Sequence, residues 1–378
     1  MRILFLQRQP CIRTLKYAVA LRAACPDMEL SFAYQGRTLG EYYGSGDELF
    51  GVWWDLGGSG RPADALRRVL DDLQPDVVHS HNLPDSLTVL ALEAVDGHVP
   101  VVHDIHDLQS LRTTPYNDGF PEPADPLGLE RIAIEGARAV ITVSPELLDV
   151  IDSAYRLPAD TLVIPNYALG RDLPEITGRS EGVGAPRIAY QGSLGTDGGH
   201  YDLRDIFRAV AGASLTLHVH PNRPVPAYRR IARRSPAMHV HAPLSPADLM
   251  RVLPRYDAGW AGFNSGLNRA HLDTVLPNKL FEYLGSGLPV LTLRGHRALA
   301  RFVAEEGVGV VLDEASHAGE AVRAMDLAGL KQAVLAARAR FTFEASIGAV
   351  VDLYESLVRS PGGRIDPAEA PLGYGSAT

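Results

Sequence analysis

Cysteine is scarce in this sequence: Cys11 and Cys25 are the only two among 378 residues. Two thiols cannot build the disulfide framework of a small secreted protein, and their spacing matches no zinc motif. We therefore expect both cysteines to be small buried side chains of a protein that works in a reducing compartment.

A long apolar segment and an excess of positive charge are also missing. The apolar run at 3–6 is followed by polar residues at 7–9, so it is too short for a signal peptide or a membrane span. The formal net charge of −9 gives no overall attraction to nucleic acid or to an anionic membrane. The four arginines between 229 and 234 are typical of a solvated helix face. We expect a cytoplasmic protein without a nucleic-acid partner and leave peripheral membrane contact open.

Lysine is rare relative to arginine, with Lys16, Lys279 and Lys331 as the only three. This bias is typical of a GC-rich, bacterial genome. It also makes a lysine inside a motif more informative than it would be elsewhere.

Short apolar runs alternate with longer amphipathic segments, which predicts an α/β protein built on parallel sheets. The length suits two domains. The candidate strands are 2–6, 29–34, 76–80, 99–105, 139–143 and 161–164, followed by 187–191, 214–220, 238–241, 257–263, 288–293 and 309–312.

A segment rich in glycine and proline at 165–186 separates the two series of strands and predicts a domain boundary. Ser144 and Ser245 each precede a proline and predict helix N-caps. A last helix near 343–358 has apolar residues at spacings of three and four. The tail at 360–378 is predicted to be disordered, and the segment 113–125 is a candidate mobile lid.

The segment 276–290 carries the most specific chemistry. Pro277 opens a predicted helix whose free N–H groups suit an anion. Lys279 adds a positive charge in the first turn, and Glu282 lies three residues later on roughly the same face. A lysine for phosphate and a carboxylate for ribose hydroxyls would make a nucleotide site. On helix statistics alone, an ordinary Lys–Glu pair on a surface helix explains the pattern equally well.

The segments 277–284 and 287–290 resemble the donor site of the retaining GT-B glycosyltransferases of family 4 (glycosyltransferase group 1). Further segments resemble that family in the same order, at 76–81, 100–107, 139–144, 163–166 and 187–194. The resemblance implies two Rossmann-like domains that face each other across a cleft. Residues 1–170 would bind the acceptor, residues 186–340 would bind the nucleotide sugar, and the helix at 343–358 would cross back to the first domain.

The same resemblance implies roles for particular residues. Glu282 would bind the donor ribose, and Asn278 and Lys279 would face its phosphates. Gly192 and Ser193 would form a turn close to the diphosphate. His106, predicted to follow the strand ending near Ile105, would lie near the transferred sugar, with His79, His81 and His103 as weaker candidates. The catalytic residues are thus predicted to be His106 and Lys279.

Three departures from the family pattern affect these assignments. The usual earlier glutamate, eight positions before Glu282, is replaced by Thr274, and Asp273 beside it is a candidate substitute for donor binding. The usual arginine and lysine after the first strand of the donor domain are missing, so His200 and Arg204 are candidates to compensate, with Lys279 carrying more of the charge as the alternative. The usual glycine pair after the first strand of the chain is also absent.

These residues lead to a hypothesis about the reaction. A sugar would pass from a nucleotide-sugar donor to a hydroxyl-bearing acceptor with retention of configuration, and the donor phosphate would act as the base. No Asp-x-Asp motif lies at a predicted strand end, so neither a metal nor another cofactor is expected. The alternatives are a nucleotide-sugar epimerase and a catalytically degenerate subunit that binds a partner transferase. A dinucleotide-dependent dehydrogenase fits less well, because no complete G-x-G-x-x-G follows the first strand.

Overall fold

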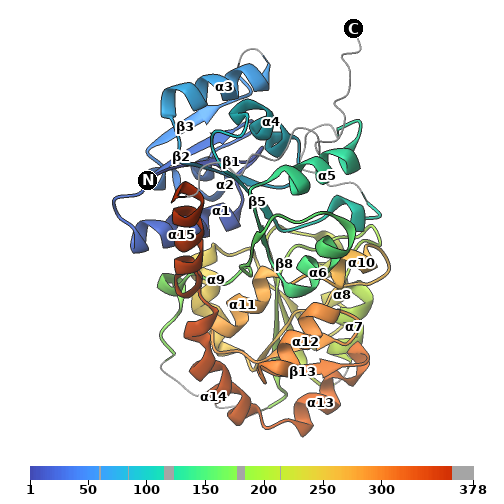
Figure 1. Cartoon of the computed structure of the whole chain (residues 1–378). Coiled ribbons are helices and arrows are strands. Elements are labelled where there is room, and N and C mark those ends of the chain that lie inside the picture. The colour runs from blue at the N-terminus through green and yellow to red at the C-terminus, as the bar shows by residue number, and fades with distance from the viewer. Residues whose placement is uncertain (59–60, 84, 115–122, 177–183, 213, 360–378) are drawn as a thin grey trace.

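The computed structural model describes residues 1–58, 61–83, 85–114, 123–176, 184–212 and 214–359. Within these residues the chain forms two parallel sheets with helices packed on them (Figure 1). We refer to residues 1–176 as the N-terminal half and to residues 184–342 as the C-terminal half. The disordered tail predicted at 360–378 and most of the predicted lid lie outside the described residues.

The first sheet has the strand order β3-β2-β1-β4-β5-β6-β7. The order places β1 inside the sheet, where it pairs with both β2 and β4. The short strand β3 was not predicted; it lies at the edge of the sheet and pairs only with β2. The strands are β1 (Arg2–Leu6), β2 (Glu29–Tyr34), β3 (Val52–Asp55), β4 (Val77–His81), β5 (Val101–Ile105), β6 (Ala139–Thr142) and β7 (Asp160–Val163).

The second sheet has the order β10-β9-β8-β11-β12-β13 and repeats the same design. Every strand in it was predicted, with ends that differ by a few residues. The strands are β8 (Arg187–Gly192), β9 (Thr216–Pro221), β10 (Met238–Val240), β11 (Ala258–Trp260), β12 (Val290–Leu293) and β13 (Gly309–Leu312).

Helices connect the strands of both sheets, as right-handed crossovers between parallel strands require. None of the described helices is long and apolar enough to span a membrane. The helices are α1 (Ile12–Ala24), α2 (Leu39–Tyr43), α3 (Pro62–Leu73), α4 (Ser86–Val95), α5 (Pro126–Gly136), α6 (Pro145–Ala154), α7 (Arg204–Ala211), α8 (Pro226–Ala232), α9 (Pro246–Val252), α10 (Arg269–Leu272), α11 (Asn278–Gly285), α12 (Arg297–Glu305), α13 (Ala318–Ala324), α14 (Leu327–Ala337) and α15 (Phe343–Arg359).

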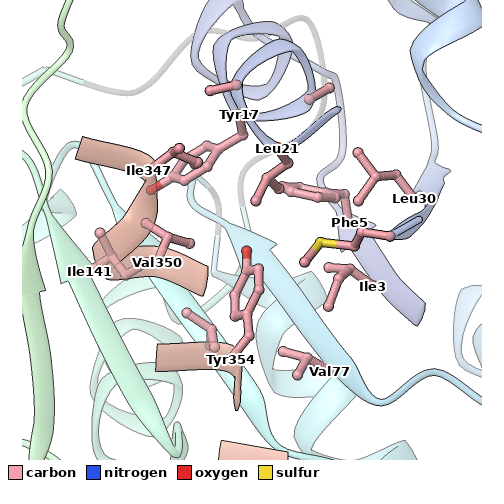
Figure 2. Close-up of a cluster of buried hydrophobic side chains, with 14 of the residues drawn as sticks. Ile3, Phe5, Tyr17, Leu21, Leu30, Val77, Ile141, Ile347, Val350 and Tyr354 are labelled. Atoms are coloured by element: carbon pink, nitrogen blue, oxygen red, sulfur yellow. The ribbon is translucent and has the colours of Figure 1, made fainter. Parts of the chain in front are cut away.

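The last helix, α15, returns to the N-terminal half and packs along α1 (Figure 1). Its apolar face carries Ile347, Val350 and Tyr354 into the same buried cluster as Phe5 and Tyr17 (Figure 2). The predicted fold class is therefore confirmed, including the crossing of the C-terminal helix. Cys11 and Cys25 are half-buried rather than buried, because they lie at the two ends of α1 instead of on its inner face.

A buried ion pair ties together the elements around α1. The Arg13 guanidinium donates to both carboxylate oxygens of Asp104 on β5, with N···O distances of 2.8 and 2.9 Å. Asp104 also accepts a hydrogen bond from the Tyr17 hydroxyl at 2.6 Å. Burial alone would raise the pKa of Asp104, but Arg13 and the histidines at 79 and 81 hold it well below its usual range. The carboxylate is therefore ionised inside the core.

Ser144 caps α6 as predicted and also joins the two halves. Its Oγ accepts from the Leu147 N–H at 3.1 Å and donates to the Thr274 carbonyl of the C-terminal half at 2.6 Å. Ser245 caps α9 in the same way at an exposed position, and its hydrogen bonds among the described residues are with Asp248 of the same helix.

We expect Ser144→Ala to lower the free energy of unfolding by about 1–2 kcal/mol, because it removes a cap and leaves a buried carbonyl without its donor. Urea unfolding followed by circular dichroism measures the change. Ser245→Ala is the matched control and should cost about 1 kcal/mol or less. Equal losses in the two variants would show that the bond to Thr274 contributes nothing.

Candidate functional site

The two halves meet where the strands of the first sheet end, at the edge where parallel α/β sheets bind ligands. Asp107, just after β5, lies 3.4 Å from His271 of the C-terminal half. Asn268 of the C-terminal half accepts from the backbone N–H of Thr113 at 2.7 Å. Glu146 on α6 pairs with Arg301 at 2.6 Å. Side chains from both halves therefore face one shared region.

Lys279 is buried in this region, on the first turn of α11. Its Nζ donates to the Tyr190 hydroxyl at 3.2 Å and lies 4.4 Å from the centre of the Tyr190 ring and 4.6 Å from that of Phe263. Burial lowers the pKa of Lys279 to about 7, although the negative charge of Glu282 acts in the opposite direction. The ammonium is thus held on aromatic faces, and the lysine itself belongs to the first turn of α11, whose N–H groups are free.

Glu282 follows one turn later on α11 and accepts a hydrogen bond from the Gln191 side chain at the end of β8. Burial raises the pKa of Glu282, while the positive charges of Lys16 and Lys279 oppose that change. Gln191 was not among the predicted site residues. It could have been noticed only by its place at the carboxyl end of the first strand of the second series.

The turn at Gly192 and Ser193 lies directly beside Lys279. Gly192 has φ +124°, a conformation that favours glycine, and a Cβ built there would lie 3.7 Å from the Lys279 Nζ. Ser193 accepts from the Asn222 amide through its Oγ at 3.0 Å, and its carbonyl accepts from the Tyr190 hydroxyl at 2.6 Å. The structure thus brings this predicted turn and the predicted lysine together.

Lys16 is a member of the site that the sequence reasoning missed. It lies on α1 of the N-terminal half, and its Nζ donates to the Asn278 Oδ1 at 2.7 Å and to the Asn166 carbonyl at 3.0 Å. Asn278 is the first residue of α11, so this bond joins α1 to the predicted donor helix. Burial lowers the pKa of Lys16 to about 8, against the attraction of Glu282. The rarity of lysine was the only signal in the sequence.

Among the candidate histidines, His106 differs from the others because it is only partly buried, whereas the other three are at most 1% exposed. Its backbone N–H donates to the Asn82 side chain at 3.1 Å, and its Nδ1 is buried with no hydrogen-bond partner among the described residues. Burial lowers the pKa of His106, so the ring is neutral near pH 7. By contrast, His103 is fully buried, with Nε2 3.1 Å from Asp85 and Nδ1 3.1 Å from Thr88.

His79 and His81 are core residues that lie close enough to Asp104 to share one metal ion with it. His79 hydrogen-bonds Tyr354 of α15, and the two imidazole rings lie 4.7 Å apart, centre to centre. Both oxygens of Asp104 already accept hydrogen bonds from Arg13, whose positive charge opposes a second cation. We therefore interpret the cluster as part of the core.

The residues considered as substitutes for missing family groups lie in different surroundings. Asp273 has an Oδ1 that lies 3.5 Å from the Arg297 N–H at the start of α12 and 3.8 Å from Arg269. Its contacts are thus with α10 and α12 rather than with Glu282. Arg204 pairs with Asp202 at 2.6 Å.

His200 lies nearer to the predicted donor region. Burial lowers its pKa to about 4, and Lys279 is among the positive charges that add to this effect. Its ring lies 6.1 Å from Phe263, which also contacts Lys279.

Comparisons with known proteins agree with this architecture. Residues 29–167 match the model of the family described as Glycosyltransferase Family 4. No curated protein matches the chain. Among solved structures, the chain is similar to a glycosyltransferase from Rickettsia africae ESF-5, with 10% identity, a TM-score of 0.69, and 96% of this chain and 99% of that chain covered.

Two other solved structures have the same fold. The Anabaena protein Alr3699/HepE in complex with UDP is 15% identical, with a TM-score of 0.64 and coverage of 94% of this chain and 100% of that one. A Listeria monocytogenes protein proposed to be a UDP-N-acetylglucosamine 2-epimerase is 17% identical, with a TM-score of 0.59 and coverage of 93% and 94%. At such identities the likeness establishes the fold. The chain therefore has the GT-B fold, and the resemblance to glycosyltransferase family 4 is confirmed by the family model over residues 29–167.

Proposed function

We propose that this protein is a retaining glycosyltransferase that moves a sugar from a nucleotide-sugar donor to a hydroxyl-bearing acceptor. The observation that carries the proposal is the buried Lys279 ammonium between the start of α11 and the Gly192 turn. The match to the family model and the GT-B fold support glycosyl transfer in general. We also propose that the two halves are separate domains, with the acceptor bound by the N-terminal one.

The geometry suits a diphosphate leaving group. When the bond to the sugar breaks, negative charge grows on the phosphate oxygen that it leaves. The Lys279 ammonium and the first N–H groups of α11 would stabilise that charge in a region with little water. Glu282 would bind the ribose hydroxyls, and Gln191, which donates to it, would fix the orientation of its carboxylate. These groups supply the electrostatic stabilisation themselves, so we expect no metal requirement.

His106 would act on the sugar and the acceptor side. Its neutral ring and its unused Nδ1 leave one nitrogen able to hydrogen-bond a sugar hydroxyl. The loop that carries it also carries Asp107, which pairs with His271 of the other half. We propose that this loop places the transferred sugar between the two halves, and that the donor phosphate receives the proton of the acceptor hydroxyl.

The first test is ligand binding. UDP, GDP, dTDP and ADP, with their common sugar conjugates, are added to the protein, and the melting temperature is measured. A ligand that binds only the folded state raises this temperature. We expect one nucleotide base to give the largest shift and Glu282→Ala to reduce it, whereas Glu305→Ala, an exposed glutamate on α12, should leave it unchanged.

Each alternative function predicts a different result in that test. A degenerate partner-binding subunit would show no shift with any nucleotide. An epimerase would bind a nucleotide sugar and change its sugar configuration with no acceptor present, which chromatography of the incubated donor would reveal. A transferase releases the sugar only to an acceptor or slowly to water.

A further inference from the structure

We propose that Lys16 is a second cation of the donor site, so that the anionic part of the nucleotide sugar is bound by one lysine from each half. This inference rests on the proposed function and deepens it. Lys279 comes from the C-terminal half and Lys16 from α1 of the N-terminal half, 262 residues away from Asn278, its bonding partner.

The first argument is the charge balance of the site. Lys16 and Lys279 are 4% and 6% exposed, yet neither makes an ion pair with a carboxylate among the described residues. Glu282 is the negative group that acts on both of them; Asp172 also attracts Lys16, but it is paired with Arg171 at 3.7 Å. While both lysines are protonated, two ammonium groups and one carboxylate leave an excess of one positive charge in a buried place. A buried charge without a partner is unfavourable, and an anionic ligand would remove that cost.

The third lysine of the chain shows the contrast. Lys331 lies 3.5 Å from Asp257 and donates to the Tyr256 carbonyl at 2.9 Å, so its charge is already paired within the C-terminal half. The two lysines without carboxylate partners are therefore the two whose charges act on Glu282 of the candidate site.

The second argument is the unused hydrogen-bonding capacity of the Lys16 ammonium. An ammonium has three N–H groups. Two of them are used by the Asn166 carbonyl and the Asn278 side chain. The third has no acceptor among the described residues, so it is available to a ligand at this place. A phosphate oxygen at the start of α11 would complete its hydrogen bonding.

One consequence is that the site is complete only when the halves are together. A donor bound to the C-terminal half alone would contact Lys279 and α11 but would lack the contact with Lys16. The anion would therefore favour the arrangement in which α1 and α11 are in contact, because a ligand stabilises the state that it binds more tightly.

The test uses calorimetry on the full chain. The probe is whichever of UDP, GDP, dTDP and ADP raises the melting temperature of the wild type most, together with its monophosphate and its nucleoside. Lys16→Gln keeps a hydrogen-bond donor but removes the charge, Lys16→Arg keeps the charge, and Lys331→Gln is the matched control. Circular dichroism confirms that each variant is folded.

We expect Lys16→Gln to weaken diphosphate binding at least tenfold, which corresponds to about 1.4 kcal/mol, and to leave nucleoside binding unchanged. Lys16→Arg should recover part of the loss, and Lys331→Gln should bind like the wild type. If Lys16 only joins the halves, Lys16→Gln would weaken nucleoside and diphosphate equally, and the inference would be wrong. Unchanged diphosphate binding would also overturn it. A wild type that binds none of the four nucleotides would instead reject the proposed function itself.

Should Lys16→Gln fail to fold, the wild type still provides a test. Binding of a diphosphate by two lysines with lowered pKa must raise both pKa values and take up protons from the buffer. Titrations at pH 8 in two buffers with different ionisation enthalpies measure this uptake for the wild type and for Lys279→Met. Proton uptake that persists in Lys279→Met supports the binding of the diphosphate by Lys16. Complete loss of proton uptake in this variant contradicts the inference.

Discussion

Arg13→Met should destabilise the folded protein by about 3–5 kcal/mol, because it leaves the Asp104 carboxylate buried without its partner. Arg13 and Asp104 are 2% and 0% exposed, so water cannot take the place of the guanidinium. The same guanidinium donates to the Ile164 carbonyl at 2.9 Å, and this bond holds the end of β7 against α1. The loss therefore combines an unpaired charge with an unsatisfied carbonyl.

Urea unfolding followed by tryptophan fluorescence and circular dichroism measures the effect. The control is Arg138→Met, which removes an equally short ion pair with Asp160 (2.9 Å) whose side chains are 37% and 34% exposed. An exposed pair contributes about 1 kcal/mol or less. If the two variants lose similar amounts of unfolding free energy, burial does not strengthen the Arg13–Asp104 pair, and the interpretation of this pair as a buried stabilising contact is wrong. Adding Asp104→Asn to Arg13→Met should recover part of the loss, since the buried charge is then gone as well.

The largest effect on activity is expected at Lys279. Once a donor and an acceptor are known, Lys279→Met should lower kcat/KM about 100- to 1000-fold, the range found when one preorganised group that stabilises developing negative charge is removed. Methionine fills a similar volume and can remain between the Tyr190 and Phe263 rings. The loss of kcat/KM would then be due to the missing positive charge and not to altered packing. Lys331→Met should keep wild-type activity, and an active Lys279→Met would exclude the lysine from the reaction.

The same lysine predicts a dependence of donor binding on pH. Burial lowers the pKa of Lys279 to about 7, and only the protonated form attracts phosphate. Tight binding is therefore present below about pH 7 and weakens as the pH rises through that value. Because the pKa of Lys16 is about 8, donor binding should continue to weaken until the pH has passed that value. The dissociation constant of the nucleoside diphosphate, measured from pH 6 to pH 9, should follow this course.

Most of the fold could be predicted because the strands are continuous apolar runs between polar turns. The observed ends of β1 and β2 coincide with the predicted ranges 2–6 and 29–34. The edge strand β3 was missed because Val52–Asp55 is short, lies between glycines and includes residues that are only half-buried. The predicted strand at 257–263 is too long, since the chain leaves the sheet after Trp260 and the Phe263 N–H bonds His296 at 2.9 Å instead of a neighbouring strand.

The candidate site was predictable only where its residues are close in the sequence. Asn278, Lys279 and Glu282 share one helix, so spacing alone placed them together. Lys16 could not be found in this way, because its place depends on how the two halves meet. Asp273 was chosen for its position next to Thr274, whereas its contacts are with α10 and α12. Its role in donor binding remains a prediction, as do the roles of the other site residues.

The return of α15 to the first sheet has a consequence for synthesis of the chain. The buried cluster around Phe5 and Tyr17 includes Phe343, Ile347 and Tyr354 near the other end of the sequence. While the ribosome is still adding the second sheet, the first sheet has emerged with one apolar surface uncovered. The N-terminal half therefore reaches its full stability only after α15 has been made, although domains generally fold in order of synthesis. Chains that stop before residue 343 would leave this surface exposed to aggregation.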